Sequence, residues 1–130
     1  MFFTKLNRRL AHDEGGFTLI ELLVVLVIIG ILLAIAVPSY LGFKDRANKR
    51  AAQSNVREAI PSAEAYYSDN NSYANLSFAS LQAIDSGIDA NLLVGNHSLG
   101  GYCLSDTVGG KTAYVHGPGG KVSMTNPASC

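Results

Sequence analysis

"GGFTLIELLVVLVIIGILLAIAVP", residues 15–38, is the stretch that decides the fold of this chain. Residues 22–37 within it carry no polar side chain. As an α-helix, the 21 residues from Phe17 to Val37 would span about 31 Å, which is enough to cross the hydrocarbon core of a bilayer. Glu21 nevertheless lies near the start of this run, where a charge costs roughly 2.5–3.5 kcal/mol on insertion scales. The stretch predicts a membrane helix containing an acid that needs a functional explanation.

The composition limits what else the chain can be. Its 130 residues have room for one small domain besides the membrane helix, and its ten basic and ten acidic residues cancel. A neutral chain has no field that would draw it to nucleic acid, so nucleic-acid binding is not indicated. We find no nucleophile with a neighbouring base, no paired carboxylates in an apolar pocket and no phosphate-binding glycine loop, so we expect no enzyme and no cofactor.

The segments on either side of the apolar run have different characters. Residues 1–16 are polar and end in a glycine pair, which suits the extended groove of a protease and predicts a leader peptide. No small-x-small cleavage site follows the run, so we expect the helix of residues 17–40 to stay in the mature protein. From residue 41 to residue 68, apolar positions recur every three to five residues with charged residues between them, which predicts an amphipathic continuation of the helix.

Three residues interrupt this long helix. Pro38 and Pro61 each lack a backbone donor, and Gly30 is a further weak point inside the membrane-spanning half. We therefore expect a curved or locally melted helix instead of a straight rod.

Residues 69–130 are expected to form a globular β domain. A turn-rich connector, residues 68–77, precedes a short helix that Ser77 would cap. Glycine pairs then separate three segments with strand-like alternation, residues 102–108, 111–117 and 121–125, and residues 91–95 are a doubtful first strand. The predicted fold class is α+β: a long N-terminal helix, transmembrane in its first half, packed on a small three- to four-stranded antiparallel sheet.

Cys103 and Cys130 are the only cysteines. An even pair in an exported domain predicts one disulfide, which would place the C-terminal domain outside the cytoplasm. Closing the loop between them is worth roughly 3.5 kcal/mol in the chain-entropy model. The alternative is a zinc site that adds His97 and His116, but no C-x-x-C spacing supports it, and we expect no metal.

Two interpretations of Glu21 remain open. The acid could simply lie near the membrane interface, protonated or extended toward water. Alternatively, it pairs with a cation supplied by another molecule. Cleavage between Gly16 and Phe17 would create that cation, because the new α-amino group of Phe17 would stand four residues from Glu21 on the same helix face. Between two staggered parallel copies the pair could form fully, and desolvation would penalise registers that leave either charge unpaired.

These residues carry a resemblance to a known family. The glycine at position 16, the following Phe-Thr-Leu-Ile-Glu and the apolar run ending in Pro38 resemble the N-terminal signature of type IV pilins and type II pseudopilins, a class III signal peptide. The resemblance covers about residues 15–40. It implies that a membrane-bound prepilin peptidase cuts after Gly16 and N-methylates Phe17. It also implies that Glu21 neutralises the amine of a neighbouring subunit, and that the helix unwinds near Gly30 to Pro38 within a filament.

The function expected from this resemblance is that of a structural subunit of a type IV pilus. The precursor would be a single-pass protein of the inner membrane, and an assembly platform with its ATPase would polymerise identical subunits into an extracellular filament. A first alternative is a pseudopilin of a type II secretion or DNA-uptake system. Major secretion pseudopilins have a calcium site formed by an acidic cluster near the C-terminus. This chain has no such cluster, which weakens this alternative. A second alternative is a monomeric binding domain on a single-span anchor.

Overall fold

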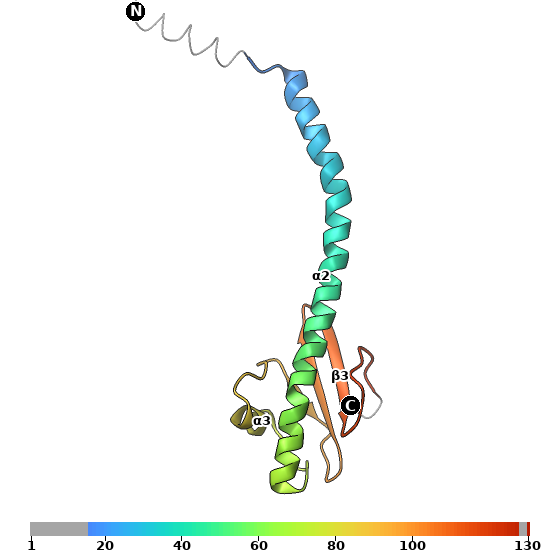
Figure 1. Cartoon of the computed structure of the whole chain (residues 1–130). Helices are drawn as coiled ribbons and strands as arrows, with labels where there is room; N and C mark the ends of the chain where they lie inside the picture. The colour runs from blue at the N-terminus through green and yellow to red at the C-terminus, as the bar shows by residue number, and fades with distance from the viewer. Residues whose placement is uncertain (1–15, 128–129) are drawn as a thin grey trace, which may run out of the picture. The chain divides into compact units, whose positions relative to one another are not determined.

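The computed structural model describes residues 16–127 and Cys130. The predicted leader, residues 1–16, therefore lies outside the described residues except for Gly16. The elements in chain order are two helices, α2 (Leu19–Asn70) and α3 (Phe78–Ile84), and three strands, β1 (Leu93–Gly95), β2 (Tyr102–Val108) and β3 (Lys111–Gly117), drawn in Figure 1. The chain divides into two compact units, Met1–Leu41 and Gly42–Cys130, which we describe in turn.

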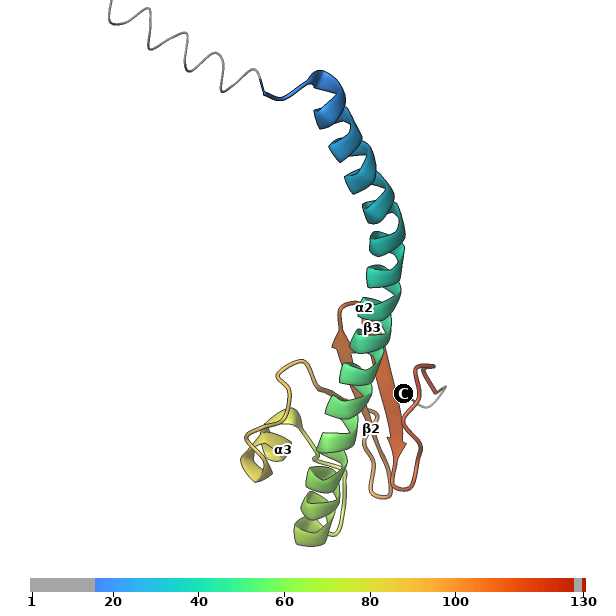
Figure 2. The same ribbon diagram turned by 45° about the horizontal axis from the view of Figure 1, so that its top comes forward.

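The first unit contributes the apolar part of α2. Every side chain from Gly16 to Leu41 is exposed, and α2 is the only helix among the described residues that is long and apolar enough to cross a membrane. Figure 2 draws this helix without interruption. It passes through Gly30 and Pro38 as α-helix, so the isolated chain shows no break at either residue. Unwinding at these positions within a filament stays a prediction.

The sheet of the second unit is antiparallel with the strand order β1-β2-β3. Strands β2 and β3 form a hairpin in which Val108 pairs with Lys111, so that only Gly109 and Gly110 lie in the turn. Both glycines have positive φ, 54° and 78°. A two-residue turn of this kind matches the right-handed twist of the strands and requires residues that tolerate positive φ.

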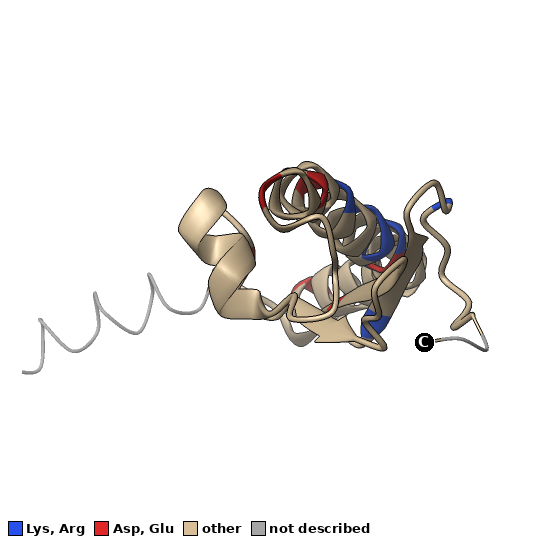
Figure 3. Cartoon of the chain, turned by 90° about the horizontal axis from the view of Figure 1, so that it is seen from below, with Lys and Arg blue, Asp and Glu red and all other residues tan. Residues whose placement is uncertain are grey.

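The core of this unit lies between the sheet and the second half of α2. Figure 3 shows the unit from below, with α2 lying over the sheet. The helix presents small side chains, and the strands present mostly larger ones. Their apolar residues with no more than 1% exposed surface are Ala52, Val56, Ala59 and Ala63 of α2 and Tyr102, Leu104, Ala113 and Val115 of the sheet. The buried helical positions follow the spacing of one face, and the predicted α+β fold is confirmed.

The connections are mostly as predicted. Helix α3 has Ser77 as its N-cap, with the Ser77 side chain accepting from the backbone N–H of Ser80 at 3.2 Å. Strands β2 and β3 coincide with the predicted segments, and the doubtful first strand is real but short.

The predicted strand at residues 121–125 is wrong. Only Ser123 pairs with the sheet, through two backbone hydrogen bonds with Tyr114 of 2.7 and 2.8 Å. The Ser123 hydroxyl then accepts from the backbone N–H of Thr125 at 3.0 Å. This local side-chain bond turns the backbone away from the edge of β3, because it offers the chain an alternative to the strand ladder.

Candidate functional site

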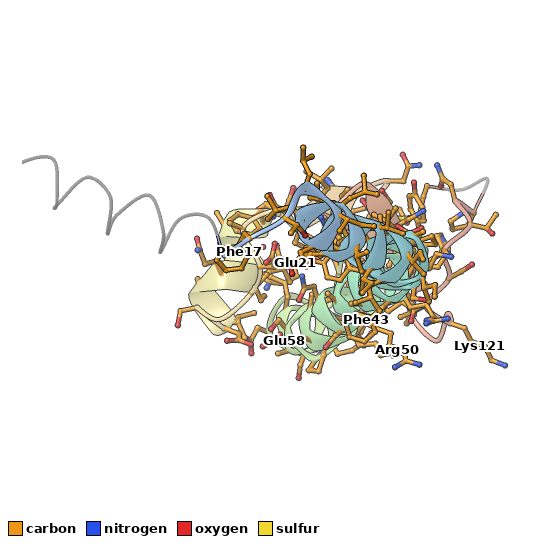
Figure 4. All side chains as sticks on the ribbon, turned by 90° about the horizontal axis from the view of Figure 1, so that it is seen from above. Phe17, Glu21, Phe43, Arg50, Glu58 and Lys121 are labelled. Atoms are coloured by element: carbon orange, nitrogen blue, oxygen red, sulfur yellow. A yellow bond between two sulfur atoms is a disulfide. The ribbon has the colours of Figure 1, made fainter. Side chains whose placement is uncertain are left out.

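The candidate site is the beginning of α2, where all the residues of the predicted cleavage and docking motif lie. Gly16 and Phe17 precede the helix and are exposed, and Leu19 is the first helical residue. Phe17 keeps 75% of its surface accessible. Figure 4 shows the Phe17 and Glu21 side chains at this same end of the helix. The peptide bond between Gly16 and Phe17 is therefore outside the helical hydrogen-bond ladder, where a protease can bind it in an extended form.

Glu21 is held by a reciprocal pair of hydrogen bonds with Thr18. The Thr18 backbone N–H donates to Glu21 Oε2 at 3.1 Å, and the Glu21 backbone N–H donates to Thr18 Oγ1 at 3.4 Å. This is a capping box, in which an N-cap threonine and a glutamate three residues later satisfy two backbone donors that the first turn of the helix leaves unpaired. The structure thus places the carboxylate at the positive end of the helix dipole.

The capping box changes the interpretation of the acid. One carboxylate oxygen of Glu21 is used locally, which offsets part of the penalty for placing the acid beside an apolar run. Glu21 Oε1 remains for a second donor from outside the first turn. Our sequence analysis missed Thr18, although the spacing Thr-x-x-Glu before an apolar run is the signal that predicts a capping box.

The two cysteines belong to the second unit. Cys103 of β2 and Cys130 form a disulfide, as expected from the sequence. The bond ties the last residue to the central strand, where the Cys130 sulfur lies 3.9 Å from the carbonyl oxygen of Val115. Neither sulfur is then a thiolate that could bind zinc, so the alternative with His97 and His116 is wrong. Among residues 16–127 and 130, no group of three or more His, Cys, Asp or Glu side chains converges as a metal site would require.

A carboxylate between two tyrosines fixes the end of α2 to the sheet. Glu64 accepts hydrogen bonds from the hydroxyls of Tyr73 at 2.9 Å and Tyr102 at 3.1 Å, one on each oxygen. Burial first, and then Glu64, raise the pKa of Tyr73 from 10.0 to about 12, and the same causes raise the pKa of Tyr102. Both rings are almost fully buried, and their centroids lie 4.7 Å apart. These tyrosines belong to the packing of the unit.

One buried acid is not paired with a base. Asp106 of β2 is 1% exposed, and its Oδ2 accepts from Asn55 Nδ2 of α2 at 2.9 Å, while Oδ1 has no hydrogen-bond partner. Burial raises the pKa of Asp106, the Asn55 hydrogen bond lowers it, and the nearby Asp89 raises it. The bond joins the helix to the central strand, so we assign it to the fold.

Comparison with known proteins identifies the family. The prokaryotic N-terminal methylation motif matches residues 12–37. The "Type IV wide pilus major component PilA4" of Thermus thermophilus is 34% identical over 120 residues, which cover 90% of this chain and 92% of that protein. The chain belongs to the family of type IV pilins and type II pseudopilins. Pilins and pseudopilins are structural proteins, and their long apolar N-terminal helix is the one found here.

Both branches of the pilin family occur among the relatives. The "Type II secretion system core protein G" of Escherichia coli (strain K12) is 33% identical over 97 residues, or 72% of this chain and 64% of that protein. The "Type IV major pilin protein PilA" of Myxococcus xanthus is 38% identical over 60 residues, but these cover only 27% of its length. The sequence identity to members of the two branches is similar, 34% and 33%. It therefore identifies the family but does not decide between a pilin and a pseudopilin.

Proposed function

We propose that this chain is a structural subunit of a type IV pilus. The observation that carries the proposal is the end-to-end match with PilA4, which extends over 92% of that pilus component, whereas the core protein G of Escherichia coli is matched over 64% of its length. The match therefore includes the second unit as well as the shared N-terminal helix. We assign no catalytic role, cofactor or metal to the subunit.

The geometry at the start of α2 supports a specific maturation step. Prepilin peptidase would cut the exposed Gly16–Phe17 bond, remove residues 1–16 and methylate the new amine of Phe17. The amine would then lie one residue before Thr18, whose N–H already donates to Glu21 Oε2. Because the capping box occupies that oxygen, Oε1 of Glu21 is the acceptor we assign to the amine of a neighbouring subunit.

The exposed part of α2 would form the core of the filament. In the membrane, lipid covers the apolar side chains of residues 17–40, and in the filament the same helices of identical subunits would cover them. Exchanging lipid for helix neighbours yields little hydrophobic gain, so close packing and the charge pair at Glu21 would supply the specificity. Extraction would need an assembly platform and its ATPase, and the subunit would move from the inner membrane to the cell surface.

The second candidate function is that of a pseudopilin in a secretion or DNA-uptake system. The match with core protein G over 72% of this chain favours it. A monomeric domain on a single-span anchor has no such support, because the end-to-end relative is named as a pilus component.

Mass spectrometry of the chain from its native membrane tests the maturation step. We expect a chain that begins with methylated Phe17. A chain that begins at Met1, or an unmethylated Phe17, would contradict the proposal and favour the simple anchor. Imaging and sequencing of sheared surface filaments then separates the branches: a pilus subunit is their main component, whereas a pseudopilin is absent from them at native expression.

A further inference from the structure

The charges of the second unit are segregated along the chain. From Gly42 to Arg57 there are five basic residues and one acidic residue. From Glu58 to Gly110 there are six acidic residues and no Lys or Arg, and from Lys111 to Cys130 there are two lysines and no acid. The unit therefore carries seven basic and seven acidic side chains, so it is neutral as a whole. Its two signs are separated in the sequence.

Three arginines of α2 share one side of the helix, and Glu58 lies on a neighbouring side. At 3.6 residues per turn, Arg46, Arg50 and Arg57 fall within about 40° of one another around α2. Glu58 lies about 80° from Arg50 on the same scale. Two residues do not follow this division: Lys44 lies about 40° from Glu58, and Glu64, which accepts from Tyr73 and Tyr102, lies about 20° from Arg57. In Figure 4, Arg50 and Lys121 lie on one side of the unit and Glu58 on the other.

We call the first side the basic flank, defined by Arg46, Arg50, Arg57 and Lys121, and the second the acidic flank, defined by Glu58 and Asp85. On the acidic flank both carboxylates lie near Gly87: a Cβ at Gly87 would lie 3.2 Å from Asp85 Oδ1 and 3.8 Å from Glu58 Oε1. All six side chains are at least partly exposed. Among the described residues, the one ion pair joins Lys111 to Asp45, so no described residue of opposite charge pairs with either flank.

We propose that the acidic flank of one copy of this chain binds the basic flank of a second copy, side by side. The inference rests on the proposed filament function and adds the surface by which the second units recognise each other. Because the two flanks are different surfaces of one molecule, the contact is heterologous, and repeating it generates an open assembly instead of a closed dimer. Opposite charges across such a contact favour one register and disfavour contacts that bring like flanks together.

The charge distribution favours a second copy over a polyanion. A membrane of anionic lipids or a nucleic acid would attract the basic flank, but the unit is neutral and its acidic flank would be repelled. Another copy satisfies both flanks at once. Binding to anionic vesicles therefore distinguishes a membrane from a second copy as the partner of the basic flank.

Charge reversal in the full-length chain, expressed in its native host without the wild-type gene, tests the proposal. We expect Glu58→Lys, and separately Arg50→Glu, to lower the amount of sheared filament at least tenfold. The double variant Glu58→Lys/Arg50→Glu exchanges the signs and should restore most of it. Co-expression of the two single variants should also restore filaments, containing both chains, because one variant is basic and the other acidic at the reversed positions. Lys44→Glu, a matched reversal six residues before Arg50 and about 120° around the helix, should leave the yield unchanged.

Several outcomes would overturn the proposal. The flank pairing is wrong if the single variants assemble as the wild type does, or if neither the double variant nor co-expression restores filaments. The proposal is also wrong if Arg50→Glu leaves the filament yield intact and removes the preference of the purified chain for anionic over neutral phospholipid vesicles. Methylated Phe17 in every variant shows that maturation persists, and an unchanged near-ultraviolet circular dichroism spectrum shows that the second unit is folded. A wild type without methylated Phe17 would instead contradict the proposed function itself.

Discussion

Helix α2 contains two regions that are equally helical but depend on different surroundings. From residue 19 to residue 41 every side chain is exposed and most are large and apolar, including Leu19, Leu26 and Ile35 with 66% or more of their surface accessible. From residue 42 to residue 70 the buried positions are small or medium-sized, and four of them have no exposed surface, namely Ala52, Val56, Ala59 and Ala63. None of the described residues covers the side chains of the first region, whereas the sheet covers the buried side chains of the second.

The difference teaches where each region obtains its stability. Burial in the second region is intramolecular, so the apolar stripe contributes to folding, and small side chains let the helix approach the strands closely. The first region buries nothing on folding, and lipid or other helices must cover it. Substitutions in the first region should therefore change assembly, and substitutions in the second should change the stability of the fold.

The largest expected effect is that of Glu21→Ala in the first region. Without the carboxylate, the amine of a neighbouring Phe17 enters the helix bundle unpaired, and an unpaired charge in an apolar environment costs several kcal/mol. We expect filaments to fall below a tenth of the wild-type amount, while Phe17 is still exposed by cleavage and the chain still inserts into the membrane. Filament yield after shearing and mass spectrometry of the N-terminus measure the two effects. A normal filament yield would contradict the charge-pair argument.

An alanine-to-leucine substitution should have different effects in the two regions of α2. Ala59→Leu adds a large side chain where Ala59 has no exposed surface, so overpacking against the sheet should destabilise the second unit by about 1–3 kcal/mol. Ala34→Leu makes the same change on the exposed part of the helix and should leave that stability unchanged. Thermal unfolding of the purified chain in detergent, followed by near-ultraviolet circular dichroism, compares the two. Equal losses of stability would show that the two regions are not independent.

Alkaline pH should act on the second region through the tyrosines held by Glu64. The pKa of Tyr73 is raised to about 12 in the folded chain, from 10.0. The folded state therefore holds the phenol proton more tightly than the unfolded state, and its stability contribution is full below about pH 10 and lost as the pH approaches 12. We expect the free energy of unfolding to fall as the pH rises from about 10 to about 12. In Tyr73→Phe the fall should be smaller; an equal fall would place its origin elsewhere.

The fold could be predicted where local signals agree, and the site only in part. The apolar run predicts α2 because a backbone in lipid must satisfy its own hydrogen bonds, and Gly109 and Gly110 predict the β2–β3 hairpin because they tolerate the positive φ of its turn. Residues 121–125 alternate like a strand, but the Ser123 hydroxyl competes for the backbone, which periodicity does not register. The partners of Glu64 lie 9 and 38 residues away, so no local pattern could pair them. Thr18 was missed although its spacing from Glu21 is a local signal.

The smallest expected effect tests the capping box at the start of the first region. Thr18→Val keeps the size of the side chain and removes the hydroxyl that accepts from the Glu21 N–H. Loss of an N-cap costs about 0.5–2 kcal/mol of helix stability, so the first turn should fray and the carboxylate should lose its fixed position. We expect filament yield to fall severalfold, less than in Glu21→Ala, with the thermal stability of the second unit unchanged. Thr18→Ser retains a capping hydroxyl and should assemble like the wild type. If serine and valine assemble equally well, the hydroxyl does not position Glu21, and the charge of the glutamate alone accounts for docking.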